Sequence, residues 1–272
     1  MIDRIHHVGV VVRSADAALG FFRDTMELEV TADQVMTEQG VRGVLLALGE
    51  NEIELLEPVV PDTGVSRFLE SRGETLHHIC LNTDNVAAEL ARLKAADVQL
   101  IDEEPREGLA GQIGFIHPSA THGVLIELAQ PRADAHTSSE KGFDHLAATV
   151  GNLDAASKTW ETVAGLRVAN IIRPESGTME IAQLPCGQCV IELLVPTSDD
   201  SPMAKRIAEQ GERASSMVAI EVEDIESEVA RYRAAGIELD DATPGVLPNS
   251  VRTSISAEQA FGLSIQLIAY SG

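Results

Sequence analysis

Hydrophobic and polar positions follow one pattern four times along this chain. Each time an apolar segment with strand periodicity comes first, a segment with helical spacing follows, and further apolar segments close the unit. Ser14 or Asp16 can cap the first helix. In the first unit the pattern predicts a strand at 5–13, a helix at 17–27 and strands at 32–36, 41–49 and 51–58.

The later units repeat this order. Residues 61–73 form a connector with a short helix at 65–71, after which the second unit opens at Leu76. The third unit opens at Phe143 and the fourth near Ser215. The pattern further predicts helices at 84–96 and 225–235 and strands at 98–101, 113–117, 123–128 and 265–268. The chain is therefore predicted to be an α+β protein of four βαβββ units in two pairs.

The stretch 132–141 is polar and has neither strand nor helix periodicity. Such a composition predicts a linker between two domains. We accordingly predict domains at 1–131 and 142–272, each with two units. Because 44% of the residues are hydrophobic, each domain can bury a core of its own.

A histidine on an opening strand and a glutamate on a closing strand occur twice in the first half. His7 and Glu54 hold these positions in the first unit, and His78 and Glu127 hold them in the second. Neutral imidazoles and carboxylates together suit a divalent first-row metal ion. We therefore predict that these four residues bind one metal. Side chains alternate along a strand, so the histidine that precedes each ligand points the other way.

The second half keeps only part of this pattern. His145 and Glu192 match the first pair. At the next two positions the chain has Met217 and Gln266, or Ser216 in place of Met217 if the register differs by one residue. A hard divalent ion loses its charged ligands there. We therefore expect no catalytic metal of the same kind in the second half.

Two further stretches deserve an interpretation. His117 follows a predicted strand, and it is either a contact to a substrate or metal ligand or a plain turn histidine. The acidic run Asp102-Glu103-Glu104 is interpreted as a solvated loop.

The composition excludes several classes of partner. Acidic residues number 43 against 20 basic ones, so the formal net charge is -23. A chain this acidic repels nucleic acid and anionic membrane surfaces. The sequence has no apolar run of membrane-spanning length and no signal-peptide pattern at its start, from which we expect a cytoplasmic protein.

These features resemble the vicinal-oxygen-chelate superfamily of glyoxalases, bleomycin-resistance proteins and dioxygenases, whose members pair βαβββ units around a metal. Within it, residues 1–131 resemble the methylmalonyl-CoA epimerase family. The second half matches only the general unit pattern and resembles a degenerate domain of the same kind. The stretches that carry the epimerase resemblance are Ile5–Gly9, Gln39–Arg42, Glu52–Pro58, Leu76–Ile79, Ile101–Arg106, Phe115–Pro118 and Gly123–Leu128.

The resemblance implies a metal-dependent isomerase that epimerises C2 of methylmalonyl-CoA, or of a similar acyl thioester, through an enolate. It implies His7, Glu54, His78 and Glu127 as ligands of one divalent ion, which is Co, Mn, Zn, Ni or Fe. Glu127 is also our candidate catalytic residue, because inversion needs an acid/base group on each face of C2. Some family members use a further glutamate as a base, and Gly43 stands at its position, so the second base stays unassigned.

The length of the chain departs from the family. Family members pair as dimers of chains about half this long. The resemblance therefore implies either a monomer that contains an internal pseudo-dimer or a homodimer, acting on an acyl-CoA or another small molecule.

Two other functions remain open within the superfamily, and a third is disfavoured by the missing ligands. A glyoxalase I-type isomerase uses related metal chemistry. Extradiol dioxygenases also have four units but hold iron in the second pair, where this chain lacks the ligands. Non-enzymatic small-molecule binding proteins typically lack the metal set, which is complete here.

Overall fold

The computed structural model describes residues 1–132, 138, 142–247 and 249–271. The first half contains β1 (Ile2–Val11), α1 (Ala15–Phe22), β2 (Val30–Met36), β3 (Val41–Leu48), β4 (Asn51–Pro58), α2 (Gly64–Arg72), β5 (Thr75–Thr83), α3 (Val86–Ala95), β6 (Arg106–Gly108), β7 (Gly111–Ile116), the 3-10 helix η1 (Pro118–Ala120) and β8 (Ile126–Gln130). The second half contains β9 (Phe143–Thr149), α4 (Leu153–Ala164), β10 (Asn170–Ile172), β11 (Met179–Cys186), β12 (Cys189–Pro196), α5 (Pro202–Gln210), β13 (Arg213–Glu221), α6 (Ile225–Ala234), β14 (Thr243–Pro244), β15 (Ser250–Ile255) and β16 (Ser264–Tyr270).

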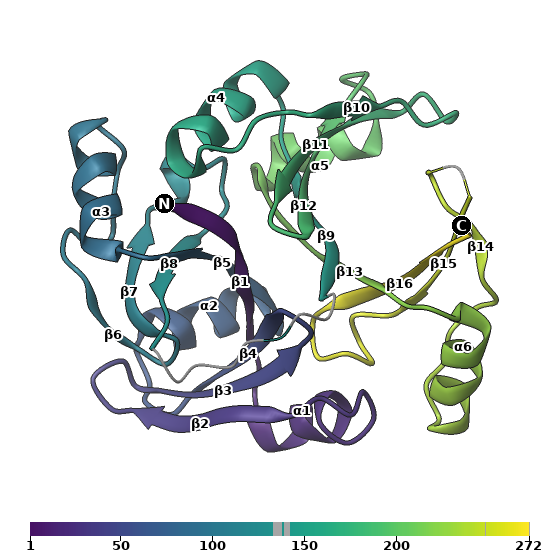
Figure 1. Ribbon diagram of the computed structural model, residues 1–272, viewed down its shortest axis with the longest axis horizontal. Helices are drawn as coiled ribbons and strands as arrows, with labels where there is room; N and C mark the ends of the chain where they lie inside the picture. Colours follow the sequence, from purple (N-terminus) through teal and green to yellow (C-terminus); the bar gives the residue numbers. More distant parts are fainter. Residues whose placement is uncertain (133–137, 139–141, 248, 272) are drawn as a thin grey trace. The chain divides into compact units, whose positions relative to one another are not determined.

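The strands form two eight-stranded sheets, one from each half of the chain (Figure 1). The strand order is β2-β3-β4-β1-β5-β8-β7-β6 in the first sheet and β10-β11-β12-β9-β13-β16-β15-β14 in the second. The second order repeats the first strand for strand. The prediction of an α+β protein built from four βαβββ units is therefore confirmed.

Helices pack on the sheets through the apolar side of each helix. α1 packs on β3 and β4, α3 on β7 and β8, and α6 on β16. In α3 the buried residues Val86, Leu90 and Leu93 recur at helical spacing, so one side of the helix faces the sheet.

Short polar residues begin the four helices that follow an opening strand. The side chain of each accepts a hydrogen bond from a backbone N–H of the first helical turn, where the helix itself offers no acceptor. These caps are Ser14 for α1, Asn85 for α3, Asn152 for α4 and Asp224 for α6. Of the two caps predicted for α1, the structure uses Ser14.

The first helix is shorter than predicted. It ends at Phe22 instead of Glu27, because the following N–H groups bond five residues back, with Asp24 to Leu19 and Met26 to Phe21. Glu27 then takes a left-handed conformation with φ of 63°. The chain reverses at this point and Met26 becomes buried.

The strand predicted at 98–101 does not form. Leu100 makes only an isolated bridge to Ile116, and the strand that pairs with β7 is β6, farther along the chain. Asp102 explains the interruption, because its carboxylate, not a backbone carbonyl, accepts the N–H of Phe115 at 3.0 Å. The predicted linker 132–141 lies almost entirely outside the described residues.

The described chain forms two compact units, and both halves contribute to each. Unit 1 contains residues 1–6, 78–132 and 145–215, and unit 2 contains 7–77, 138, 142–144, 216–247 and 249–271. In unit 1 the Arg92 guanidinium donates to the carbonyl of Thr162 at 2.8 Å. In unit 2 Arg231 donates to the carbonyl of Thr25 at 2.7 Å. Each unit thus joins one βαβββ module of the first half to one of the second.

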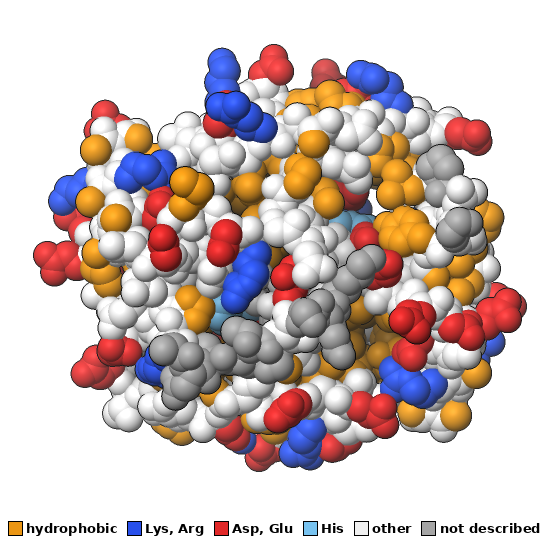
Figure 2. Space-filling model, viewed as in Figure 1, with side chains coloured by type: hydrophobic (Ala, Val, Ile, Leu, Met, Phe, Trp, Pro, Cys, Tyr) orange, Lys and Arg blue, Asp and Glu red, His pale blue; other side chains and the backbone are white. Residues whose placement is uncertain are grey.

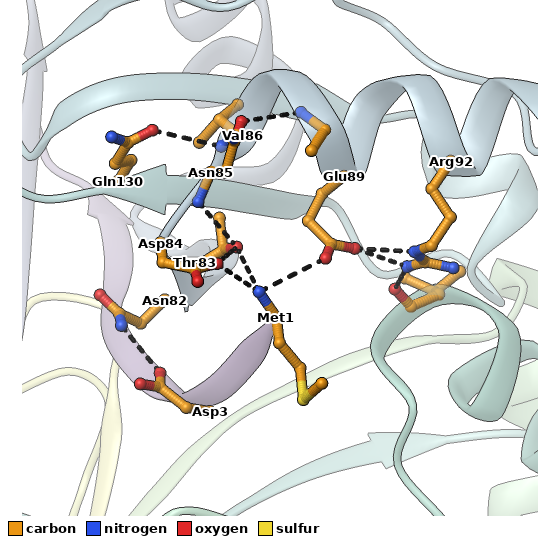
Figure 3. A network of polar contacts seen from close by, with 12 residues as sticks. Met1, Asp3, Asn82, Thr83, Asp84, Asn85, Val86, Glu89, Arg92 and Gln130 are labelled. Carbon is orange, nitrogen blue, oxygen red and sulfur yellow. Dashed lines mark hydrogen bonds and ion pairs between the residues drawn. The ribbon is translucent and has the colours of Figure 1, made fainter.

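A polar network in unit 1 surrounds the start of β1 (Figure 3). The terminal amino group of Met1 pairs with Asp84, and this hydrogen bond lowers the pKa of the Asp84 carboxyl. The same amino group lies 3.6 Å from Glu89, which also pairs with Arg92 at 2.8 Å. The network connects the beginning of β1 to α3.

Among the described residues, no helix is long and apolar enough to cross a membrane.

Candidate metal centre

His7 and Glu54 face each other across two parallel strands of unit 2. β1 pairs with β4 so that Gly9 lies opposite Glu54, and His7 stands two residues earlier on β1. The Nε2 atom of His7 lies 3.5 Å from Oε2 of Glu54. Both side chains are buried, with exposed fractions of 0% and 5% for the residues.

His78 and Glu127 repeat this arrangement in unit 1. β5 pairs with β8 in parallel so that Cys80 lies opposite Glu127, and His78 stands two residues earlier on β5. The Nε2 atom of His78 lies 3.0 Å from Oε2 of Glu127, and both residues are buried. The two His–Glu pairs therefore have the same register in the two halves of one sheet.

The donor set fits a divalent metal ion. Burying a carboxylate costs several kcal/mol unless a cation or hydrogen-bond donors compensate it. Imidazole nitrogen and carboxylate oxygen are ligands that first-row ions accept together. Within the described part of the chain, the groups that could hold a metal are His7, Glu54, His78 and Glu127, and the overlapping group His6, His7 and Cys80. The first group is the one that the sequence predicts.

The histidine next to His78 has a separate role. The ring of His77 contacts Phe68 of α2 edge-on, with 4.7 Å between ring centroids. This contact agrees with the alternation of side chains along β5, which directs neighbouring residues to opposite faces of the sheet.

The ring of His78 is supported by residues for which the sequence predicted no role at the site. Phe115 meets it edge-on at 5.4 Å between ring centroids. The guanidinium of Arg106 lies over the Phe115 ring, 5.3 Å from its centroid. Asp102 accepts hydrogen bonds from both Arg106 Nε and the Phe115 backbone N–H.

The interpretation of Asp102-Glu103-Glu104 as a solvated loop is wrong for its first residue. The Asp102 side chain is only 18% exposed. The one signal available in the sequence was an aspartate four residues before an arginine within a stretch that resembles a known family. His117 is a turn residue, because its Nδ1 accepts the N–H of Ser119 and caps η1.

In the second half, hydrogen bonds within the protein replace part of the pattern. His145 Nε2 lies 3.9 Å from Glu192 Oε2, and Gln183 donates a hydrogen bond to the same carboxylate at 2.9 Å. The pairing of β13 with β16 places Ala219 opposite Gln266. Met217 stands two residues before Ala219, so Met217 and not Ser216 occupies the position of His78.

Charge is distributed widely outside these pairs. Figure 2 shows acidic side chains spread over the viewed face with basic ones among them. Arg42 on β3 forms ion pairs with Asp33 at 2.8 Å and with Asp16 at 2.9 Å. The hydrogen bond from Arg42 lowers the pKa of the Asp33 carboxyl. Arg42 is therefore an internal ion-pair partner.

The repeated strand order of the two sheets agrees with a comparison to known protein families. The sequence model of the Glyoxalase/Bleomycin resistance protein/Dioxygenase superfamily matches residues 6–117 and again residues 144–250. The chain belongs to this superfamily. Since one match falls on each sheet, the fold consists of two tandem domains of the superfamily.

Named relatives in the superfamily resemble the first half. The ethylmalonyl-CoA/methylmalonyl-CoA epimerase of Cereibacter sphaeroides is 35% identical over 133 residues, which are 48% of this chain and 99% of the relative. The mitochondrial methylmalonyl-CoA epimerase of Mus musculus is 33% identical over 131 residues, which are 47% of this chain and 74% of the relative. These likenesses cover one of the two tandem domains.

The tandem arrangement has a relative among solved structures. A variant of 4-hydroxymandelate synthase from Streptomyces coelicolor matches with a TM-score of 0.79, covering 100% of this chain and 94% of that chain. The identity is 17%, so this likeness shows the fold alone.

Proposed function

We propose that this protein is a metal-dependent epimerase that inverts C2 of methylmalonyl-CoA or of a similar 2-substituted malonyl thioester. The observation that carries the proposal is the pair of buried His–Glu contacts with one shared register, at 3.5 Å and 3.0 Å. Both pairs fall within the domain that is 35% identical to a bacterial epimerase of such thioesters.

The proposed ligands of one divalent ion are His7, Glu54, His78 and Glu127. The ion is proposed to be Co, Mn, Zn, Ni or Fe, all of which accept imidazole and carboxylate donors. When bound, such an ion supplies Lewis acidity that stabilises the negative charge left on the thioester as the C2 proton departs. Each histidine must be neutral to donate a lone pair, so metal affinity is expected to fall at acidic pH.

Glu127 is the proposed acid/base residue. Its carboxylate lies beside His78 and is buried. Burial protects a proton transfer there from bulk water. An epimerase must remove a proton from one face of C2 and return it to the other. Glu127 is proposed to serve one face, and the residue that serves the other face is not assigned.

The residues of the second domain disfavour the reaction of extradiol dioxygenases, which also have four units and hold iron in the second pair. The positions equivalent to His78 and Glu127 are occupied by Met217 and Gln266. Neither supplies the imidazole and carboxylate that a ferrous site of that type uses. The proposal for the second domain is that it serves as a built-in partner for the first, which supports a monomer with an internal pseudo-dimer over a homodimer.

Proton–deuterium exchange at C2 tests the function. Metal-loaded protein and methylmalonyl-CoA of one configuration are incubated in D2O, and both epimers are analysed for deuterium. We expect deuterium at C2 and equilibration of the two configurations. A double variant His7→Ala plus His78→Ala serves as the metal-deficient control and should show neither.

The alternatives within the superfamily predict different results in the same experiment. A glyoxalase I-type isomerase leaves methylmalonyl-CoA unchanged and converts the hemithioacetal of methylglyoxal and glutathione. A binding protein takes up a ligand without any exchange. Either result would replace the epimerase proposal.

A further inference from the structure

Arg106 lies on the same sheet face as the His78–Glu127 pair. In the antiparallel pairing of β6 with β7, Arg106 stands opposite Ile113, and two residues on, Phe115 stands opposite Glu127 on β8. Directly opposite residues in antiparallel strands project to one face, and so do residues two apart on one strand. One face of the sheet therefore carries Arg106, Phe115 and Glu127 in a row.

The guanidinium is held in this row by an aromatic ring. It lies 5.3 Å from the centroid of Phe115, within the range of a cation–π contact. The Phe115 ring meets His78 edge-on, with an interplanar angle of 87°. A single aromatic ring thus separates Arg106 from a proposed metal ligand.

Asp102 fixes the orientation of Arg106 but uses only part of its donor capacity. Its carboxylate accepts Arg106 Nε at 3.2 Å and is itself held by the Phe115 N–H. The two terminal nitrogens of Arg106 make no hydrogen bond to any described residue, and 36% of its side chain is exposed. Arg42, by contrast, has its terminal nitrogens engaged by Asp16 and Asp33.

We propose that Arg106 binds an anionic oxygen group of the substrate through these two terminal nitrogens. A guanidinium presents two parallel donors that match a carboxylate or a phosphate, and the ring and Asp102 already hold it in place. The identity of the substrate rests on the proposed epimerase function. Methylmalonyl-CoA carries both a carboxylate and the phosphates of CoA, and a protein of net charge -23 needs a local cation to receive it.

Direct binding tests the proposal without reliance on turnover. The dissociation constant of methylmalonyl-CoA is measured by calorimetry for metal-loaded wild type, Arg106→Gln and Arg106→Lys. We expect Arg106→Gln to bind about 10- to 100-fold more weakly, as loss of charge-assisted hydrogen bonds produces. Arg106→Lys should recover part of the affinity, because lysine keeps the charge but not the planar pair of donors.

A matched control separates this effect from general loss of charge. Arg167 pairs with Glu161 of α4 at 2.7 Å, and the Arg167 side chain is 79% exposed. Arg167→Gln should bind methylmalonyl-CoA as wild type does. Thermal unfolding and metal content are measured for every variant, and both should stay unchanged in Arg106→Lys, which keeps the proposal testable if Arg106→Gln is destabilised.

The source of the anion is decided with a phosphate-free substrate. The methylmalonyl thioester of N-acetylcysteamine keeps the carboxylate and lacks the phosphates of CoA. If Arg106→Gln weakens the binding of both thioesters, Arg106 binds the carboxylate. If it weakens the binding of the CoA ester alone, Arg106 binds a phosphate. In kinetic assays either case raises KM far more than it lowers kcat.

The outcomes for Arg106 and for the epimerase function are distinguishable. Unchanged affinity of Arg106→Gln for both thioesters, beside an active wild type, overturns the role of Arg106 and leaves the epimerase function intact. A wild type that binds methylmalonyl-CoA through Arg106 but exchanges no C2 proton supports the anion site and sinks the epimerase. A wild type that binds neither thioester overturns both.

Discussion

Arg252 donates a hydrogen bond of 2.9 Å to the side-chain oxygen of Gln266. The strand register puts Gln266 opposite Ala219, just as Glu127 lies opposite Cys80. Gln266 therefore has the position of Glu127 in the second domain. The Arg252 guanidinium already binds its amide oxygen. In the second domain this arginine therefore takes the place that a metal ion is proposed to have beside Glu127.

The protein is expected to bind one divalent ion per chain. Elemental analysis after reconstitution should give about one equivalent, which the variant His7→Ala plus His78→Ala should lose. Gln266→Glu should leave the count at one, because Arg252 pairs with the new carboxylate and no histidine stands at Met217. A second equivalent in wild type or in Gln266→Glu contradicts this prediction.

Glu127→Gln should lose turnover far more than substrate affinity. The amide cannot carry the proton, and loss of a general acid/base group lowers kcat by about 10²- to 10⁴-fold. Because Glu127 is also a proposed ligand, metal content is determined on the same preparation. Full activity in a metal-loaded Glu127→Gln protein removes this residue from the mechanism.

Gly123→Ala should destabilise the protein more than Gly165→Ala does. Both glycines have positive φ, of 75° and 71°, so both variants carry a conformational cost of about 1–2 kcal/mol. A Cβ at Gly123 would lie 1.7 Å from the carbonyl oxygen of Glu212, whereas nothing lies within 4 Å at Gly165. Overpacking adds about 1–3 kcal/mol at Gly123.

Urea denaturation of the two glycine variants measures the difference. It reports the close approach of the second βαβββ module to the third within unit 1, since Gly123 and Glu212 belong to different halves of the chain. Equal losses in the free energy of unfolding would show that this approach contributes nothing to stability.

Tyr232 should make the protein sensitive to alkaline pH. Burial raises the pKa of its hydroxyl, although the neighbouring Arg231 opposes the shift. The folded-state pKa then exceeds the unfolded value of about 10, so the contribution to stability is complete below that pH. It is lost as pH rises through the folded-state pKa. Tyr232→Phe should therefore lose less stability than wild type between neutral and strongly alkaline pH.

Denaturant unfolding of wild type and Tyr232→Phe at a series of pH values tests this. The two free energies of unfolding should converge or cross as pH rises above about 10. Parallel curves over that range would show that Tyr232 ionises equally in the folded and unfolded chain.

The sequence by itself determined the repeated architecture and the four proposed ligands. Strand and helix periodicity are local properties, so the strands near Val41 and Asn51 and the helix near Ile225 were predicted within a few residues of their observed bounds. The repeat made His7, Glu54, His78 and Glu127 recognisable, because each recurs at the same distance from the start or close of its unit.

Only the tertiary structure decided features that depend on which segments meet. The register of β13 with β16 assigned Met217 to the position of His78, and pairing with β7 left 98–101 without a strand. The contacts of Phe115 with His78 and with Arg106 join three strands, and no local periodicity predicts which strands lie next to each other. Strand pairing and side-chain packing join residues far apart in the chain, so these contacts are fixed by the fold and not by any short stretch of sequence.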